Sequence, residues 1–149
     1  MKIKELFQII EERDLPLARE DDSIRGVLEK MLKHPHSRMI YVVDADGRCQ
    51  GFISLGTLIR HLFSSSFEPA VHARFVIPMI TAETARHIMD TGLIYATEDE
   101  EVEAVIKKMV KAAIKEIPVL DESNRIIGDI TMLDLLCHCE PDQDQGLSG

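Results

Sequence analysis

The fold is decided by two related stretches, Leu15-Pro16-Leu17-Ala18-Arg19-Glu20-Asp21 and Leu93-Ile94-Tyr95-Ala96-Thr97-Glu98-Asp99, in which Leu, Ala, Glu and Asp recur at the same spacing. The correspondence continues in register from Gly26–Met31 to Ala104–Met109. The first copy then carries one extra residue near His34–His36, after which the correspondence resumes. The repeat is longer than the roughly 20–50 residues of a solenoid unit. The chain is therefore interpreted as one domain half that is present twice.

Both copies have the same order of sequence patterns. A short apolar run predicts a strand, and the acidic cluster behind it predicts a helix start, because carboxylates stabilise the positive end of the helix dipole. Apolar residues at helical spacing follow, then two β-rich runs joined by turn residues, and then a last helix. The expected class is α+β, with two β-α-β-β-α units. The expected strands are Leu15–Ala18, Met39–Val43 and Cys49–Ile53 in the first copy, and Leu93–Ala96, Ile117–Leu120 and Ile126–Ile130 in the second; the expected helices are Ile24–Met31 and Leu55–Phe63, and Val102–Met109 and Met132–Cys139.

The remaining segments complete the expected domain organisation. Residues 1–66 form the first repeat and begin with an amphipathic helix over Met1–Glu12, in which Ile3, Leu6, Phe7 and Ile10 point inward. Residues 67–83 connect the copies, and their apolar residues favour a packed connection. Residues 84–139 form the second repeat, with a short helix over Thr84–Met89. The polar, acidic tail 140–149 is expected to be disordered.

Composition excludes several classes of function. The 17 Lys and Arg against 26 Asp and Glu give a net charge of −9, which argues against binding to nucleic-acid backbones. No apolar run approaches the roughly 20 residues that span a bilayer, and the N-terminus lacks the apolar run of a secretion signal. The three cysteines form no CxxC pair. A cytoplasmic protein with reduced thiols is the expectation.

The loop Gly128-Asp129-Ile130-Thr131-Met132-Leu133-Asp134 lies where a strand leads into a helix. Backbone N–H groups at a helix start attract anions, and the hydroxyl of Thr131 is placed to contact a phosphate. Asp134 lies one turn further along on the same face, where its carboxylate can accept both hydroxyls of a ribose. Gly128 permits close approach to the backbone. The alternative is a capping box that only satisfies the free N–H groups of the helix start.

In its pair of β-α-β-β-α units, each ending in Gly-h-h-Ser/Thr-x-x-Asp with h apolar, the chain resembles a tandem of CBS domains, also called a Bateman module. The resemblance covers about residues 1–139, although Asp129 stands where an apolar residue is usual. It implies a pseudo-twofold module that binds AMP, ADP, ATP or related adenosyl ligands between the repeats. It also implies the ligand contacts of the second copy: Gly128, Thr131 and Asp134 on phosphate and ribose, Tyr95, Ala96, Thr97, Ile117 and Pro118 on the base, and Lys115 near phosphate.

The first copy departs from this pattern at one position. It keeps Gly51 and Ser54 but has Thr57 where the family has an aspartate. A neutral hydroxyl cannot form the charged ribose contact, and this loss costs on the order of 1.5–3 kcal/mol, or about ten- to a hundredfold in affinity. The second site is therefore expected to be the stronger one. The first is expected to be empty or to bind a different ligand through Ser54, Thr57 and Arg38. For Lys115, a solvated surface lysine is the alternative.

Other clusters carry no clear chemistry. Neighbours on a helix point to different faces, so Cys137-His138-Cys139 is not expected to hold a metal, and Cys137 is interpreted as a core residue. His34-Pro35-His36 is interpreted as a surface loop. Met31 and Met109 are expected in the core. We identify no catalytic constellation, and therefore expect no enzyme, no catalytic residue, no required cofactor and no metal.

The expected function is a stand-alone regulatory module that senses an adenine nucleotide and signals to an unidentified effector protein. The resemblance further implies a homodimer packed through helices, with Leu58, Leu62, Leu135 and Leu136 as candidate contacts, although burial within one module explains these leucines equally. A ligand-free structural or interaction module is the alternative. The missing acidic residue at Thr57 favours that alternative in part, and Asp134 argues against it.

Overall fold

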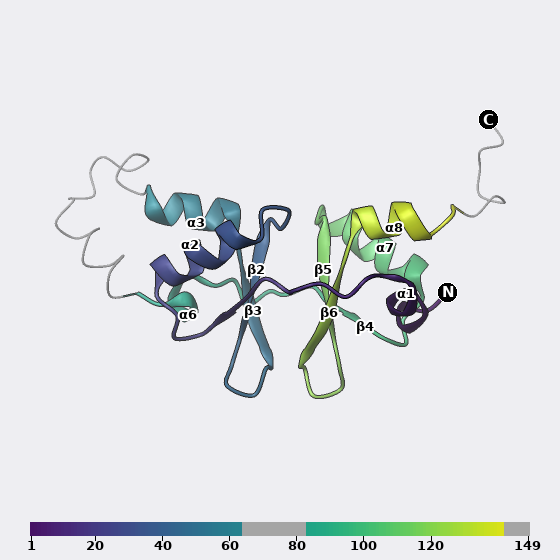
Figure 1. Cartoon of the computed structure of the whole chain (residues 1–149), viewed down its shortest axis with the longest axis horizontal. Coiled ribbons are helices and arrows are strands. Elements are labelled where there is room, and N and C mark those ends of the chain that lie inside the picture. The colour runs from purple at the N-terminus through teal and green to yellow at the C-terminus, as the bar shows by residue number, and fades with distance from the viewer. Residues whose placement is uncertain (64–82, 142–149) are drawn as a thin grey trace.

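The computed structural model describes residues 1–63 and 83–141. Its strands form two three-stranded sheets, in the order β1-β2-β3 and β4-β5-β6 (Figure 1). In each sheet the first two strands are parallel and the last two form an antiparallel hairpin. The predicted α+β architecture of two β-α-β-β-α units is confirmed. The expected connection 67–83 and tail 140–149 lie almost entirely outside the described residues.

The first half contains β1 (Leu17–Arg19), α2 (Ile24–Lys33), β2 (Met39–Val43), β3 (Cys49–Ser54) and α3 (Leu55–Leu62). The local chemistry sets these bounds. The hydroxyl of Ser23 accepts a hydrogen bond from the Gly26 N–H at 3.0 Å and caps α2. Gly47, at a φ of 82°, closes the hairpin between β2 and β3. Ser54 caps α3 as Ser23 caps α2.

The second half repeats this order with β4 (Ala96–Thr97), α7 (Val102–Ala112), β5 (Glu116–Leu120), β6 (Ile126–Thr131) and α8 (Met132–His138). Helix α7 ends at Ala113, which adopts the left-handed conformation with a φ of 56°. Asn124, at a φ of 65°, takes the turn position that Gly47 takes in the first half. Both expected core methionines, Met31 and Met109, are buried.

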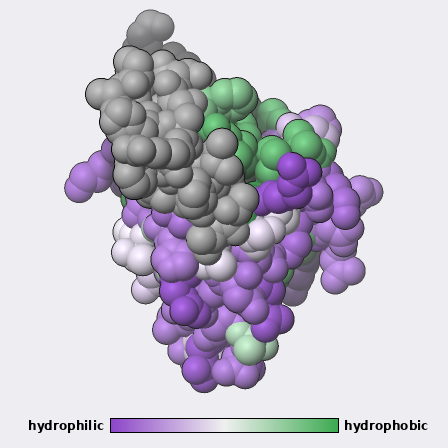
Figure 2. Space-filling model, turned by 90° about the vertical axis from the view of Figure 1, so that its left-hand side faces the viewer, coloured by the Kyte–Doolittle hydropathy of each residue, from purple (hydrophilic) through white to green (hydrophobic). Residues whose placement is uncertain are grey.

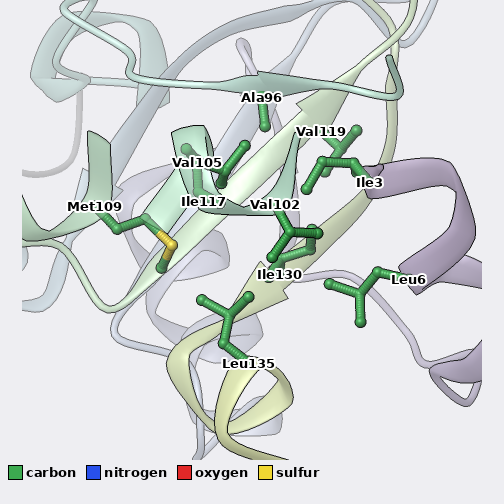
Figure 3. Close-up of a cluster of buried hydrophobic side chains, with 10 residues drawn as sticks. All are labelled: Ile3, Leu6, Ala96, Val102, Val105, Met109, Ile117, Val119, Ile130 and Leu135. Carbon is green, nitrogen blue, oxygen red and sulfur yellow. The ribbon is translucent and has the colours of Figure 1, made fainter. Parts of the chain in front are cut away.

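The two short helices α1 (Ile3–Ile9) and α6 (Ala85–Ile88) are exchanged between the halves. Ile3 and Leu6 of α1 are fully buried in the second core, among residues of α7, β5, β6 and α8 (Figure 3). Ala85 of α6 is fully buried in the first core. Backbone bonds fix the exchange, since Ile3 donates to the Glu100 carbonyl at 3.0 Å and Ala85 donates to the Asp22 carbonyl at 2.8 Å. Each hydrophobic core is thus completed by a helix that lies next to the other half in the sequence.

The two sheets lie towards the middle of the molecule, with α2 and α3 on one outer side and α7 and α8 on the other (Figure 1). Residues 10–16 must cross the middle, because α1 packs on the second half and β1 belongs to the first. The hairpins also meet, since Cys49 donates to the Asn124 carbonyl at 2.9 Å. The buried carboxylate of Glu116 accepts a hydrogen bond from the Arg38 backbone N–H, and burial raises the pKa of that carboxyl.

Candidate functional site

Thr131 and Asp134 form a reciprocal capping box at the start of α8. The Asp134 backbone N–H donates to the Thr131 hydroxyl at 3.2 Å, and the Thr131 backbone N–H donates to Oδ2 of Asp134 at 2.8 Å. The capping geometry that the sequence offered as the alternative is therefore present. It leaves Oδ1 of Asp134 outside the box, so capping and ligand binding do not exclude one another.

Arg13 is the residue at this site that the sequence did not predict. Its guanidinium donates to both carboxylate oxygens of Asp134, from Nη1 to Oδ1 at 3.0 Å and from Nη2 to Oδ2 at 2.7 Å. It also donates from Nε and Nη2 to Oδ1 of Asp129 at 3.0 and 2.9 Å. A further bond from Nη2 reaches the Asp129 carbonyl at 3.0 Å. One arginine thus binds two aspartates that flank the expected phosphate contact, Thr131.

The surroundings act differently on these three charges: they favour the charged forms of Asp134 and Arg13 and disfavour that of Asp129. Burial acts to raise the pKa of Asp134, but the bonds from Arg13 and from the Thr131 N–H outweigh it and lower that pKa below its ordinary value. Burial raises the pKa of Asp129 above its ordinary value, although the guanidinium of Arg13 acts against the shift. The hydrogen bond to Asp134 contributes most to raising the pKa of Arg13. Asp129 therefore depends on Arg13 for its charge, since its side chain is only 4% exposed.

Two cavities meet at Arg13. One, of about 620 Å³, is lined by Phe7, Leu15 and the loop Ile127–Asp129, among others. The other, of about 450 Å³, is lined by Asp134 and His138. Ile10, Glu11, Glu12 and Arg13 line both cavities. Each volume falls within the roughly 300–1,000 Å³ of small-molecule sites.

Gly128 permits a close approach, as its position in the sequence indicated, but the approaching group belongs to the chain. A Cβ atom at Gly128 would lie 2.8 Å from Cζ of Phe7. The equivalent Gly51 of the first half is approached by backbone, because a Cβ there would lie 2.4 Å from the Asp90 carbonyl oxygen. At Gly128 the close neighbour is helix α1 itself, and at Gly51 it is the segment that follows helix α6. Each glycine therefore leaves room for an exchanged helix or for the residues next to it.

The other expected contacts of the second site are dispersed. The side chains of Ala96 and Ile117 are fully buried in the second core, and Pro118 is buried in β5.

The remaining expected contacts lie at the surface. Tyr95 is exposed, with the Lys108 ammonium 5.9 Å from its ring centre. Thr97 lines a separate cavity of about 410 Å³ beside Leu120 and Asp121. Lys115 is exposed, and its carbonyl accepts a hydrogen bond from Met132 at 2.9 Å, which brings its backbone to the start of α8.

The first half has no carboxylate at the corresponding place. The Thr57 N–H donates to the Ser54 hydroxyl at 3.1 Å, and the two hydroxyls are also 3.1 Å apart. Arg60 donates to Oγ1 of Thr57 at 3.4 Å. The Arg38 carbonyl accepts a bond from Leu55, so the backbone of Arg38 lies beside the start of α3. The two halves thus share a helix-start geometry and differ in charge.

Among residues 1–63 and 83–141, no group of three or more His, Cys, Asp or Glu side chains is placed to hold a metal ion. In the same residues, no helix is long and apolar enough to cross a bilayer. The interpretation of Cys137 as a core residue is wrong, because Cys137 is exposed. Cys139 packs against the second core instead, because the face of α8 that meets the core continues through Leu135 to Cys139.

Comparison with known proteins decides the family. The family model of the CBS domain matches residues 3–64 and 85–140. The chain belongs to the CBS-domain family. The two CBS matches coincide with the two halves along the sequence, so the chain is a CBS-domain pair.

Solved CBS-domain structures are similar over nearly the whole chain. A CBS domain-containing protein from Thermotoga maritima is 29% identical, with a TM-score of 0.68 over 91% of this chain and 92% of that one. The CBS domain pair of protein MJ0100, in complex with 5′-methylthioadenosine and S-adenosyl-L-methionine, is 25% identical, with a TM-score of 0.68 over 92% and 94%. L-aspartate semialdehyde sulfurtransferase of Methanocaldococcus jannaschii is 27% identical over 118 residues, 79% of this chain. The chain spans only a fifth to about a quarter of the length of the curated relatives that it matches, 20% and 26%.

Proposed function

We propose that this CBS-domain pair is a regulatory module that binds an adenosine-containing ligand beside Asp134 and transmits its occupancy to a partner protein. The observation that carries the proposal is the carboxylate of Asp134 at the start of α8, whose pKa is lowered and which lies next to the Thr131 hydroxyl and lines a cavity of about 450 Å³. A carboxylate at this place can accept the two hydroxyls of a ribose, and the N–H groups of the helix start can donate to an anionic group. The related pair that binds methylthioadenosine and S-adenosylmethionine supports the adenosyl class.

The second half is proposed as the stronger site. Thr131 and Asp134 would contact phosphate and ribose, with Lys115 near the phosphate. The base contacts at Tyr95, Ala96, Thr97, Ile117 and Pro118 stay predictions; those at Ala96 and Ile117 would involve backbone atoms, because their side chains are buried. The first site, with Ser54, Thr57 and Arg38, would be empty or weaker. No catalytic role, required cofactor or metal belongs to the proposal, and a cytoplasmic location is proposed with it.

Titration calorimetry with adenosine, AMP, ADP, ATP, methylthioadenosine and S-adenosylmethionine tests this function. The wild type should bind at least one of these ligands at a single strong site. Asp134→Asn keeps the size of the side chain and its acceptor for the Thr131 N–H but loses the charge, so affinity should fall about ten- to a hundredfold. Thr57→Val in the first half is the matched control and should leave the strong site unchanged. Binding that is equal in wild type and Asp134→Asn would remove Asp134 from the site.

An interaction module without a ligand is the second candidate, and exposed apolar side chains favour it. Ile59 and Leu136, which are equivalent in the two repeats, are 50% and 80% exposed. Leu55 on α3, Phe63 at the C-cap of α3 and Leu133 on α8 are exposed as well. Figure 2 shows apolar residues gathered on the upper part of the side that the first half forms.

Two of the four leucines expected in a dimer contact, Leu58 and Leu135, are instead buried in the cores. A third, Leu62, packs partly against the first core.

Burial of these faces in a homodimer is proposed for both candidates. Sedimentation equilibrium of the wild type should give a dimer. A double variant, Ile59→Lys and Leu136→Lys, should be monomeric and should still unfold cooperatively, because both side chains are exposed in the single chain. A wild type that stays monomeric at high protein concentration would exclude the dimer. A monomer that still binds adenosyl ligands would favour the sensing function over the interaction module.

A further inference from the structure

The guanidinium of Arg13 occupies the acceptors that a ribose would use. Oδ2 of Asp134 accepts two hydrogen bonds, from Arg13 at 2.7 Å and from the Thr131 N–H at 2.8 Å. A carboxylate oxygen has two lone pairs, so Oδ2 is fully used. Oδ1 accepts one bond, from Arg13 at 3.0 Å. A ribose diol that donates one hydroxyl to each oxygen needs a free acceptor on both. Such a diol can bind only after Arg13 has left Asp134.

Asp129 ties Arg13 to this place. Three of the five contacts of the guanidinium go to Asp129, whose side chain is only 4% exposed. A buried carboxylate that loses the cation paired with it is strongly destabilised. Complete departure of Arg13 is therefore unfavourable, whereas its bonds to the more accessible Asp134 can be exchanged for bonds from a ligand. The hydroxyl of fully buried Tyr41 lies near Asp129. Burial raises the pKa of that hydroxyl, and the charge of Asp129 adds to the rise.

The first half provides an internal comparison. Its residue equivalent to Asp129 is Phe52, whose backbone N–H donates to the Asp90 carbonyl at 2.9 Å. The segment that follows α6 is thus fixed by a backbone bridge. In the second half, the segment that follows α1 is fixed by the side chain of Arg13. A side-chain contact can be exchanged without breaking a strand bridge, so the two crossing segments differ in how readily they are released.

We propose that Arg13 is an internal competitor of the second-half site, held by Asp129, and that a ligand binds there by exchanging its ribose hydroxyls for the guanidinium on Asp134. This inference rests on the proposed function. Because Arg13 lines both cavities, its release would join the cavity at Gly128 to the one at Asp134. Because residues 10–16 cross from one half to the other, the exchange would also loosen a connection between the halves. Ligand binding in the second half would thereby affect how the first half is held against it.

The test measures adenosine affinity by titration calorimetry in wild type and in a double variant, Arg13→Met with Asp129→Leu. Adenosine carries the ribose diol without a charge, so phosphate electrostatics do not enter. The double variant removes the competitor and leaves no buried charge unpaired, and it should bind adenosine at least tenfold more tightly than wild type. Arg13→Lys keeps a cation for Asp129 but cannot form the fork to Asp134, and its affinity should lie between the two. Arg86→Met, which removes an exposed arginine bonded to Glu20, is the matched control and should have no effect.

Three outcomes decide between the inference and the function on which it rests. Tighter binding by the double variant and by Arg13→Lys supports both. Binding that needs Asp134 but is unchanged or weaker in both Arg13 variants overturns the competitor and leaves the proposed function standing. Absence of binding by wild type, by both variants and with every adenosyl ligand overturns the function and the inference together. Cooperative urea unfolding, recorded for each variant, establishes that the compared proteins are folded.

Discussion

Asp129 and its counterpart in the other copy differ in charge and polarity. Phe52 at the equivalent position of the first half is apolar, as the family pattern leads one to expect, whereas Asp129 brings a charge to a position that is 5% exposed. The sequence showed the departure but not its partner. Arg13 lies 116 residues away along the chain, and no local pattern links the two. A buried carboxylate requires a cation or a set of hydrogen-bond donors. A buried Asp129 therefore needs such a partner, but the sequence does not indicate which residue provides it.

The pair predicts a clear double-mutant cycle. Arg13→Met leaves Asp129 buried without a cation and should lower the unfolding free energy by about 3 kcal/mol, near the lower end for a broken buried pair because Arg13 itself is partly exposed. Arg13→Met with Asp129→Leu removes both charges and should be near wild type. Urea denaturation of Arg13→Met, of Asp129→Leu and of the double variant measures the coupling. Equal losses for Arg13→Met and the double variant would show that the charge of Asp129 does not depend on Arg13.

The lowered pKa of Asp134 predicts how the unfolding free energy depends on pH in acid. Its pKa lies below the ordinary value of 3.8 because bonds from Arg13 and Thr131 outweigh burial, so folding favours the ionised form. Its contribution is complete above that ordinary value and is lost as the pH falls through the lower pKa of the folded state. The unfolding free energy of Asp134→Asn should therefore fall less steeply than that of wild type between pH 5 and pH 2.5, roughly the range of that titration. Parallel pH profiles of the two proteins would contradict the prediction.

At the level of elements, the sequence predicted nearly all helices and strands of the described residues. The reason is local: Ser23, Ser54 and Thr131 cap helices, and apolar spacing marks the face of each helix. The bounds of β1 and β4 were less accurate, because two or three residues carry little periodic signal. The partner of α1 could not be predicted. An amphipathic helix presents an apolar face, but its sequence does not state which core receives it.

The exchange of α1 predicts where damage to that helix appears. Leu6 is fully buried in the second core, and Leu6→Ala should cost about 2–5 kcal/mol. Amide hydrogen exchange should then become faster in β5 and β6, although these strands lie more than 100 residues further along the chain. Ile88→Ala in α6 is the matched variant and should act on β2 and β3, because Ile88 packs against the first core. Faster exchange in β2 and β3 of Leu6→Ala alone would show that α1 stabilises its own half.

At the level of the whole molecule, neither half is complete along the sequence. A fragment of residues 1–63 contains the first sheet without α6, and a fragment of residues 83–149 contains the second sheet without α1. We expect each fragment alone to lack a cooperative unfolding transition. Mixed in equal amounts, the fragments should form a one-to-one complex that unfolds cooperatively, which circular dichroism and sedimentation velocity can measure. Cooperative unfolding of either fragment by itself would show that the exchanged helix is dispensable.

The exchange of α1 and α6 is a domain swap that is closed within one polypeptide. Between two separate chains, such a swap forms and dissociates with protein concentration. Joining the partners converts the second contact into an intramolecular one, whose effective concentration is fixed by the connection and not by the abundance of the protein. Dilution can therefore separate one copy of this molecule from another, but not one half from the other. A signal that changes the packing of the two halves is for this reason independent of how much of the protein is present.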